Sequence, residues 1–291
     1  MLKKILTLIL VIICIVPLFA QGGTEVSVKK TSDLRIVSLA PNVTEMIYAL
    51  GSGDNLVGRT DYCNYPEEAK NVQSIGTLWD PNMETILALD ADVAIASSIV
   101  DPSFIDSLNK AGIKAYQFYE ENSYEGTYTL IEKVADVIGK QAEGQKIIQD
   151  MKARAEEIRK ITSMVNMRRS AVFIIGYGDW GDYAATGDTF LDGVIEAAGG
   201  VNAAKSGIAW SISKELLLEK DPDVILLAGN QASDPQTEIA TFTSLEPYSR
   251  LSACKNGKVY VIDGDAAQRQ GVRTIETVEE IAKLLYPGLF I

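Results

Sequence analysis

Two glutamates, Glu84 and Glu215, stand at matching places in two copies of one sequence template, 131 residues apart. In each copy the glutamate opens a short apolar helix, an Asp-x-Asp-Val turn follows, and an apolar run continues as a buried strand. Asn82 and Ser213 stand two residues before these glutamates, where a side-chain oxygen can cap the helix. The helix dipole stabilises such a carboxylate by roughly 0.3–1 kcal/mol, which alone would explain either glutamate. The occurrence of the same arrangement twice predicts two similar lobes, each with one carboxylate at the same place that can bind a partner.

Histidine is absent from the chain, which removes several kinds of chemistry at once. Ser-His-Asp hydrolysis, Cys-His catalysis, histidine-liganded zinc or manganese and histidine-ligated haem are all excluded. The sequence also has no phosphate-binding GxxxxGK[ST] loop and no CxxC motif. Paired acids such as Asp179 and Asp182 keep an exported α/β enzyme open as an alternative, but acids are abundant here. We expect no catalytic residues, no metal site and no cofactor.

The first twenty residues have the features of a secretory signal. Lys3 and Lys4 precede an apolar run that is short for a membrane span, and Ala20 precedes the expected cleavage point. A lipoprotein signal at Cys14 is the alternative. The net charge of −12 becomes more negative by two when the signal is removed, and such a chain repels nucleic acid and anionic membranes. We expect an exported, periplasmic monomer that binds no nucleic acid.

Two cysteines, Cys63 and Cys254, remain after the signal. They fall in different predicted lobes, and a bridge between them would clamp the lobes together. We therefore favour two unpaired, mostly buried thiols.

The elements that carry these residues alternate between strand and helix along the chain, as in α/β proteins. Among them we expect a loop at 40–44 that leads into a helix at 45–50, and a final helix at 274–285. Apolar positions on one stripe of residues 143–162 predict a long helix, roughly 30 Å in length, as the natural connection between lobes. We expect two Rossmann-like α/β lobes joined by a single long interlobe helix, with a ligand cleft between them. A helical connection restricts the lobes to small motions. The expected divisions are 1–20 signal, 21–33 flexible leader, 34–140 N-terminal lobe, 141–166 interlobe helix and 167–291 C-terminal lobe.

The pattern resembles the class III solute-binding proteins of ABC importers, which have a helical interlobe connection and carry vitamin B12, ferric siderophores or haem. The resemblance covers nearly the whole chain after the signal. Its segments include Pro-Asn-Val-Thr-Glu at 41–45, Asp-Tyr-Cys-Asn-Tyr-Pro at 61–66, Ala-Gly-Gly-Val-Asn at 198–202 and the two template copies. It implies that Glu84 and Glu215 dock onto arginines of the membrane permease, which works with its ATPase. Bidentate pairing suits carboxylate and arginine to that role.

The resemblance also places several aromatic residues at the cleft: Tyr62, Trp79, Tyr177, Trp180 and Trp210. An arbitrary tyrosine or tryptophan belongs to the core more often than to a ligand site. Trp79 and Trp210, however, each stand five residues before a template glutamate. A cleft walled by flat aromatic groups suits a large ring system of low charge, as in the B12-binding members. A corrinoid is therefore the expected ligand.

The number of basic residues at the cleft helps to distinguish between the candidate ligands, because ferric siderophore binders usually have several basic residues there. Only Arg269 is a good candidate here, with Arg59 and Arg273 as weaker ones. Arg269 and Arg273 are equally well explained as structural partners of Asp263 or Asp265 at a strand end. A ferric siderophore or another iron chelate remains the main alternative ligand. Haem is less favoured, because the segment 76–80 lacks the tyrosine ligand that haem carriers of this family place there. A sensor that reuses the fold is a further alternative.

Overall fold

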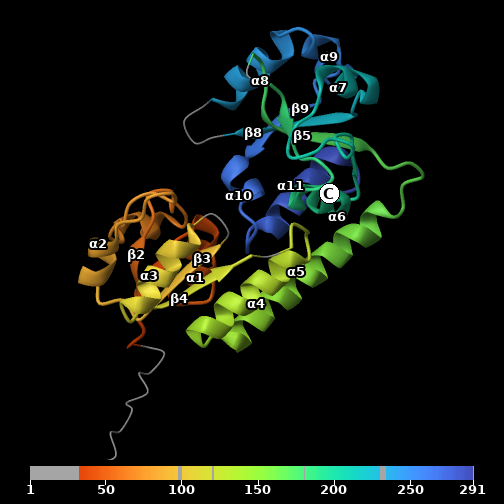
Figure 1. Cartoon of the computed structure of the whole chain (residues 1–291). Coiled ribbons are helices and arrows are strands. Elements are labelled where there is room, and N and C mark those ends of the chain that lie inside the picture. The colour runs from red at the N-terminus through yellow and green to blue at the C-terminus, as the bar shows by residue number, and fades with distance from the viewer. Residues whose placement is uncertain (1–32, 98–99, 120, 180, 230–233, 291) are drawn as a thin grey trace, which may run out of the picture.

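The computed structural model describes residues 33–290, except 98–99, 120, 180 and 230–233. The predicted signal at 1–20 and nearly all of the predicted leader therefore lie outside the described residues. Figure 1 shows two α/β lobes, an N-terminal one in orange and yellow and a C-terminal one in teal and blue, with the helices α4 and α5 beside them. Within the described part of the chain, none of the helices combines the length and the apolar character that crossing a membrane requires.

The N-terminal lobe has a sheet of four parallel strands in the order β2-β1-β3-β4. Helices or loops cross over between these strands, because parallel neighbours cannot be joined by a tight hairpin. The elements are β1 Ile36–Ser38, α1 Pro41–Ala49, β2 Leu56–Arg59, α2 Met83–Ala88, β3 Val93–Ser97, α3 Pro102–Lys110 and β4 Lys114–Phe118. The two-lobed α/β architecture expected from the sequence is confirmed.

The C-terminal lobe repeats this plan with one antiparallel strand added. Strands β7, β5, β8 and β9 pair in parallel, while β6 runs antiparallel to β5. The strands are β5 Ser170–Gly176, β6 Tyr183–Ala184, β7 Val201–Asn202, β8 Val224–Gly229 and β9 Val259–Asp263. The helices are α6 Phe190–Ala197, α7 Lys214–Lys220, α8 Pro235–Ser244, α9 Ser252–Lys255, α10 Gly264–Gln268 and α11 Thr274–Leu285.

The two template copies fold alike, down to the hydrogen bonds of their turns. Asp92 accepts the backbone N–H of Arg35 at 2.8 Å, and Asp223 accepts that of Ser170 at 2.8 Å. Each aspartate thus ties the strand that it leads into, β3 or β8, to the start of the central strand beside it. The second aspartate of each turn therefore has the same structural role in both lobes, which is to join two neighbouring strands.

Helices α4 Gly126–Ile138 and α5 Gln141–Thr162 form the connection between the lobes (Figure 1). The 22 residues of α5 span about 33 Å. Near its first turn, Gly144 lies so close to Ala135 of α4 that a Cβ would stand 2.7 Å from the alanine methyl group. At its last turn, Thr162 packs against Gly199 of the C-terminal lobe. The long helix therefore begins beside the first lobe and ends beside the second.

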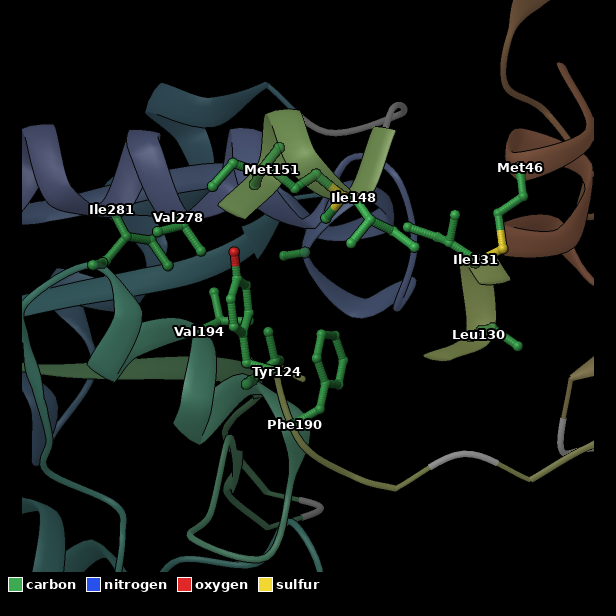
Figure 2. Packing of buried hydrophobic residues seen from close by; sticks show 14 of the residues in the cluster. Met46, Tyr124, Leu130, Ile131, Ile148, Met151, Phe190, Val194, Val278 and Ile281 are labelled. Atoms are coloured by element: carbon green, nitrogen blue, oxygen red, sulfur yellow. The ribbon is translucent and has the colours of Figure 1, made fainter. Parts of the chain in front are cut away.

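One hydrophobic core runs through both lobes along this connection. Its buried members include Met46 of α1, Ile131 of α4, Ile148 and Met151 of α5, and Ile281 of α11. Figure 2 shows the two α5 side chains between α11 on one side and α4 on the other, with α4 facing Met46 in turn. Two smaller cores cover the outer faces of the two sheets. Because the inner core is continuous, the lobes are packed as one unit on the side where α4 and α5 connect them.

Several elements differ from the expectation. Helix α1 begins at Pro41 instead of Glu45, because proline suits the first helical position, where its missing N–H is not needed. Residues 41–44, expected as a loop, thus form the first turn, and Glu45 lies inside the helix. Helix α10 and the strands β6 and β7 have too few residues for a periodic apolar pattern to predict them. Helix α8 has ten residues but buries only Phe242, so its sequence has little apolar stripe.

Candidate functional site

The two template glutamates lie on exposed helix ends, one on each lobe. Glu84 and Glu215 both occupy the second position of their helices, α2 and α7, as predicted. The capping side chains of Asn82 and Ser213 each accept a hydrogen bond from the backbone N–H three residues further on. Both glutamates are exposed to solvent. Their carboxylates are therefore held on rigid first turns and are available to a partner.

A cavity of about 650 Å³ lies between the lobes. Its apolar wall comes from both of them and consists of Ala40, Pro41, Tyr62, Leu78, Phe118, Leu130, Phe190 and Trp210. Its polar lining is mostly uncharged, with Asn42, Ser97, Asn122, Gln268 and Gln270. Cavities of this size and mixed lining are typical of small-molecule sites.

Side-chain amides at the cavity join the segments that form it. Asn42 of the first lobe donates to the carbonyl oxygen of Gln270 in the second at 3.0 Å. Gln270 in turn donates to the carbonyl oxygen of Ser123 at 2.8 Å. Asn122 accepts the backbone N–H of Phe190 at 2.9 Å. These bonds hold the two lobes together along the lining of the cavity.

An interlobe charge cluster, made of Glu45, Asp263, Asp265, Arg269 and Arg273, lies at one side of the cavity. Arg273 donates through two nitrogens to Glu45, at 2.7 and 2.6 Å, and contacts Asp263 at 3.1 Å. Arg269 contacts Glu45 and Asp265, both at 3.0 Å. Burial alone would lower the pKa of Arg273, but the hydrogen bond and charge of Glu45 outweigh it and raise that pKa. Arg273 is therefore a permanent cation bound to the other lobe.

The comparison with known families decides which kind of site this is. The model of the family described as periplasmic binding protein matches residues 36–266, which is most of the chain. The chain belongs to the periplasmic binding protein family. It is therefore a substrate-binding protein of ABC-type import and not an enzyme.

Two relatives and one solved structure are similar to this periplasmic binding protein. An "Uncharacterized ABC transporter substrate-binding lipoprotein YvrC" of Bacillus subtilis is 29% identical, over 92% of this chain and 85% of the relative. A "Vitamin B12-binding protein" of Photorhabdus laumondii is 26% identical, over 87% of this chain and 88% of the relative. The solved structure of the periplasmic heme-binding protein HutB of Vibrio cholerae has a TM-score of 0.79 with 23% identity, and covers 88% of this chain and 100% of its own. The last likeness shows the fold alone.

Three of the predicted ligand residues line the cavity of this periplasmic binding protein: Tyr62, Trp210 and Arg269. Trp79 does not line it, but its ring stands edge-on to that of Tyr62, 5.3 Å between centroids, and 66% of the residue is exposed. Tyr177 lies away from the cavity, edge-on to Phe242 at 4.9 Å in the core of the C-terminal lobe. Trp180 lies outside the described residues. The ligand roles of these side chains stay predictions.

The tryptophan pair is matched in sequence but not in surroundings. Trp79 belongs to a loop closed by pairing of Gly76 with Pro81, and it faces solvent. Trp210 has a positive φ of 66° in a tight turn between Ile208 and Ser211, and it packs against the shared core. The two indoles are therefore not equivalent, although each precedes a helix that carries a template glutamate.

Structural partners are found for four of the charged residues considered from the sequence: Arg59, Arg269, Arg273 and Asp182. Arg269 and Arg273 pair with the aspartates as the structural alternative predicted, and Arg269 also lines the cavity. Arg59 donates to the carbonyl oxygens of Thr60 and Lys70 and does not line the cavity. Buried Asp182 accepts the hydroxyl of Tyr248, which is a structural contact.

Glu45, whose carboxylate forms ion pairs with both Arg269 and Arg273, was not predicted as a site residue from the sequence. The side chain is 1% exposed. The available signal was a single acid inside the apolar run of α1, next to Met46 and Ile47, where an unpaired charge would be costly. Sequence reasoning also missed Leu78, Phe118 and Phe190 of the cavity wall, since isolated apolar residues in sequence do not reveal a cavity.

The two cysteines of the described region are free thiols. Cys63 is buried, with its sulfur 3.2 Å from the hydroxyl of Thr60. Burial raises the pKa of the half-buried Cys254 to about 11. The preference for unpaired thiols over an interlobe disulfide is borne out.

Proposed function

We propose that this periplasmic binding protein captures a corrinoid in the interlobe cavity and delivers it to a permease that docks on Glu84 and Glu215. The cavity wall carries the main argument: it brings aromatic and aliphatic groups from both lobes together with uncharged amides. A corrinoid is a large, nearly flat ring system whose rim carries uncharged amide groups. The B12-binding relative from Photorhabdus supports the same choice.

A ferric siderophore or other iron chelate is the second candidate. The fold is shared with iron-chelate and haem carriers, so architecture does not separate them. The argument against an anionic chelate is that Arg269 provides the cavity's positive charge and is already paired with two carboxylates. Haem has a weaker case, since Leu78 lines the wall where the family's haem carriers place a tyrosine, although Tyr62 offers one phenol.

Tryptophan fluorescence of the purified protein tests the ligand. Titration with cyanocobalamin is expected to quench the emission in a saturable way. Trp210→Phe is expected to remove more of the quenching than Trp79→Phe, because Trp210 lines the cavity and Trp79 does not. A ferric hydroxamate and haem are titrated in parallel, the haem also with Tyr62→Phe. Binding of either iron compound without saturable binding of cobalamin would overturn the corrinoid proposal.

The docking proposal rests on the exposed position and matched capping of the two glutamates. Glu84→Ala combined with Glu215→Ala is expected to abolish uptake into cells or permease-containing vesicles while ligand affinity stays unchanged. Glu67→Ala with Glu246→Ala is the matched control, because these exposed acids form only local ion pairs on one lobe each. Weaker ligand binding by the docking variant, or normal uptake, would contradict the docking role.

We further infer export through the signal at 1–20, with cleavage after Ala20. The Bacillus relative is described as a lipoprotein, which supports the alternative of lipidation at Cys14. Intact-mass spectrometry of the mature protein separates the two. A chain that starts at Gln21 without added mass supports cleavage by signal peptidase, whereas a diacylated start at Cys14 supports the anchor.

A further inference from the structure

We propose that Glu45 sets the charge of the ligand cavity: by holding Arg269 from across the lobe boundary, it leaves the cavity with no available cation and makes it select against anionic ligands. This rests on the proposed function only in taking the interlobe cavity as the ligand site. Among the described residues that line the cavity, only Asp265 and Arg269 carry a formal charge. The charge that a ligand meets in the cavity therefore depends on whether Arg269 is already paired with protein carboxylates.

The guanidinium of Arg269 is nearly saturated by protein oxygens. Its Nη1 donates to Oδ1 of Asn64 at 2.7 Å and to Oε1 of Glu45 at 3.0 Å. Its Nη2 donates to the carbonyl oxygen of Tyr62 at 3.2 Å and contacts the Asp265 carboxylate at 3.0 Å. A guanidinium has five N–H groups, four of them on these two nitrogens. A carboxylate or catecholate ligand would have to displace protein oxygens to form a bidentate pair.

Glu45 is held in its place next to Arg269 by hydrogen bonds from a second arginine, Arg273. Arg273 donates hydrogen bonds to both carboxylate oxygens of Glu45, and its own side chain is 7% exposed. The guanidinium of Arg273 also stacks over the ring of Tyr65, 4.1 Å from its centroid. These contacts hold the Glu45 carboxylate next to Arg269 whether or not a ligand is present.

The balance of the interlobe charge cluster is slightly negative. Three carboxylates face two guanidiniums, which leaves one net negative charge beside the cavity. An anionic ligand would meet this charge in a partly desolvated site, where electrostatic repulsion is stronger than in water. An uncharged or cationic ligand pays no such penalty. The geometry therefore assigns the cavity to uncharged or cationic ring systems.

Substitution of Glu45 by its uncharged isostere tests this assignment. The probes are cyanocobalamin and ferrichrome, both uncharged overall, and a ferric catecholate, which is strongly anionic. Wild type is expected to bind an uncharged probe and to bind the catecholate weakly. In Glu45→Gln the interlobe charge cluster changes from one net negative charge to none, and Arg269 keeps Asp265 as its one carboxylate partner. The affinity for the catecholate relative to the uncharged probe should therefore rise about tenfold or more.

Two further variants keep the test decisive if Glu45→Gln folds poorly. Asp265→Asn also releases Arg269, and its side chain is 39% exposed, so folding should tolerate the change. Glu246→Gln is the control, since it removes an exposed acid from a surface pair with Arg250. Circular dichroism checks the fold of each variant.

The outcomes separate this inference from the proposed function. Binding of ferrichrome but not cobalamin by wild type would overturn the corrinoid proposal and leave the charge assignment supported. Tighter binding of the catecholate than of both uncharged probes by wild type would overturn the charge assignment. So would an unchanged ratio of affinities in both Glu45→Gln and Asp265→Asn.

Discussion

Replacement of Met151 by alanine is expected to destabilise both lobes at once. Met151 lies on α5, is 1% exposed, and belongs to the core that runs from α1 through α4 and α5 to α11 (Figure 2). Truncation of a buried methionine to alanine costs about 2–5 kcal/mol, from lost transfer free energy and the cavity left behind. Little relaxation is expected, because Met151 packs in one buried cluster with Ile148 of its own helix and Ile281 of α11. We expect a loss in the upper half of that range.

Urea unfolding measures this loss, and hydrogen exchange with mass spectrometry locates it. We expect a single transition by fluorescence and circular dichroism, with peptides from both sheets losing the same protection. Met167→Ala is the matched control, because Met167 follows the same helix and is 83% exposed, so its loss should cost less than about 0.5 kcal/mol. Two separate transitions, or loss of protection in only one lobe, would refute the idea of a shared core.

Three smaller predictions follow from local geometry. Removal of the cap in Asn82→Ala should cost about 1 kcal/mol in unfolding free energy, and an unchanged melting temperature would show that the cap bond is unimportant. Gly199→Ala should cost more than Gly257→Ala, as both have positive φ but only at Gly199 would the added Cβ meet Thr162, at 2.5 Å; equal losses in thermal unfolding would argue against this contact. The Cys254 thiol, with its pKa raised to about 11 by burial, is protonated at pH 8 and should react with iodoacetamide many times more slowly than in urea; rapid alkylation of the native protein would contradict this.

The regular elements of this chain could be predicted where the pattern was long or repeated. Helix α11 was predicted with its observed bounds, Thr274–Leu285, because its apolar stripe is continuous. The start of α1 was missed because Pro41 was interpreted as part of a loop instead of as a first helical residue. The two-residue strands β6 and β7 depend on neighbours in the sheet, which a local pattern does not contain.

The candidate site was predictable in its exposed part and much less so in its cavity. Glu84 and Glu215 were placed correctly, since caps and helix starts are local signals. Tyr177 was expected near the cleft, but it packs into the aromatic core of its own lobe, where hydrophobic burial holds it. Which face of a loop an aromatic ring turns to depends on what packs against it, and that is tertiary information.

The two lobes, the matched helices of Glu84 and Glu215 and the exclusion of histidine chemistry could be predicted from the sequence, because they follow from local patterns, a visible repeat and composition. That Arg269 lines the cavity while already paired with two carboxylates follows from tertiary packing alone. One of these carboxylates, Glu45, lies 224 residues away in the chain and on the other lobe. No local propensity links two such residues. They meet because the shared core sets the position of one lobe against the other, and because a buried charge is stable only where an opposite charge reaches it.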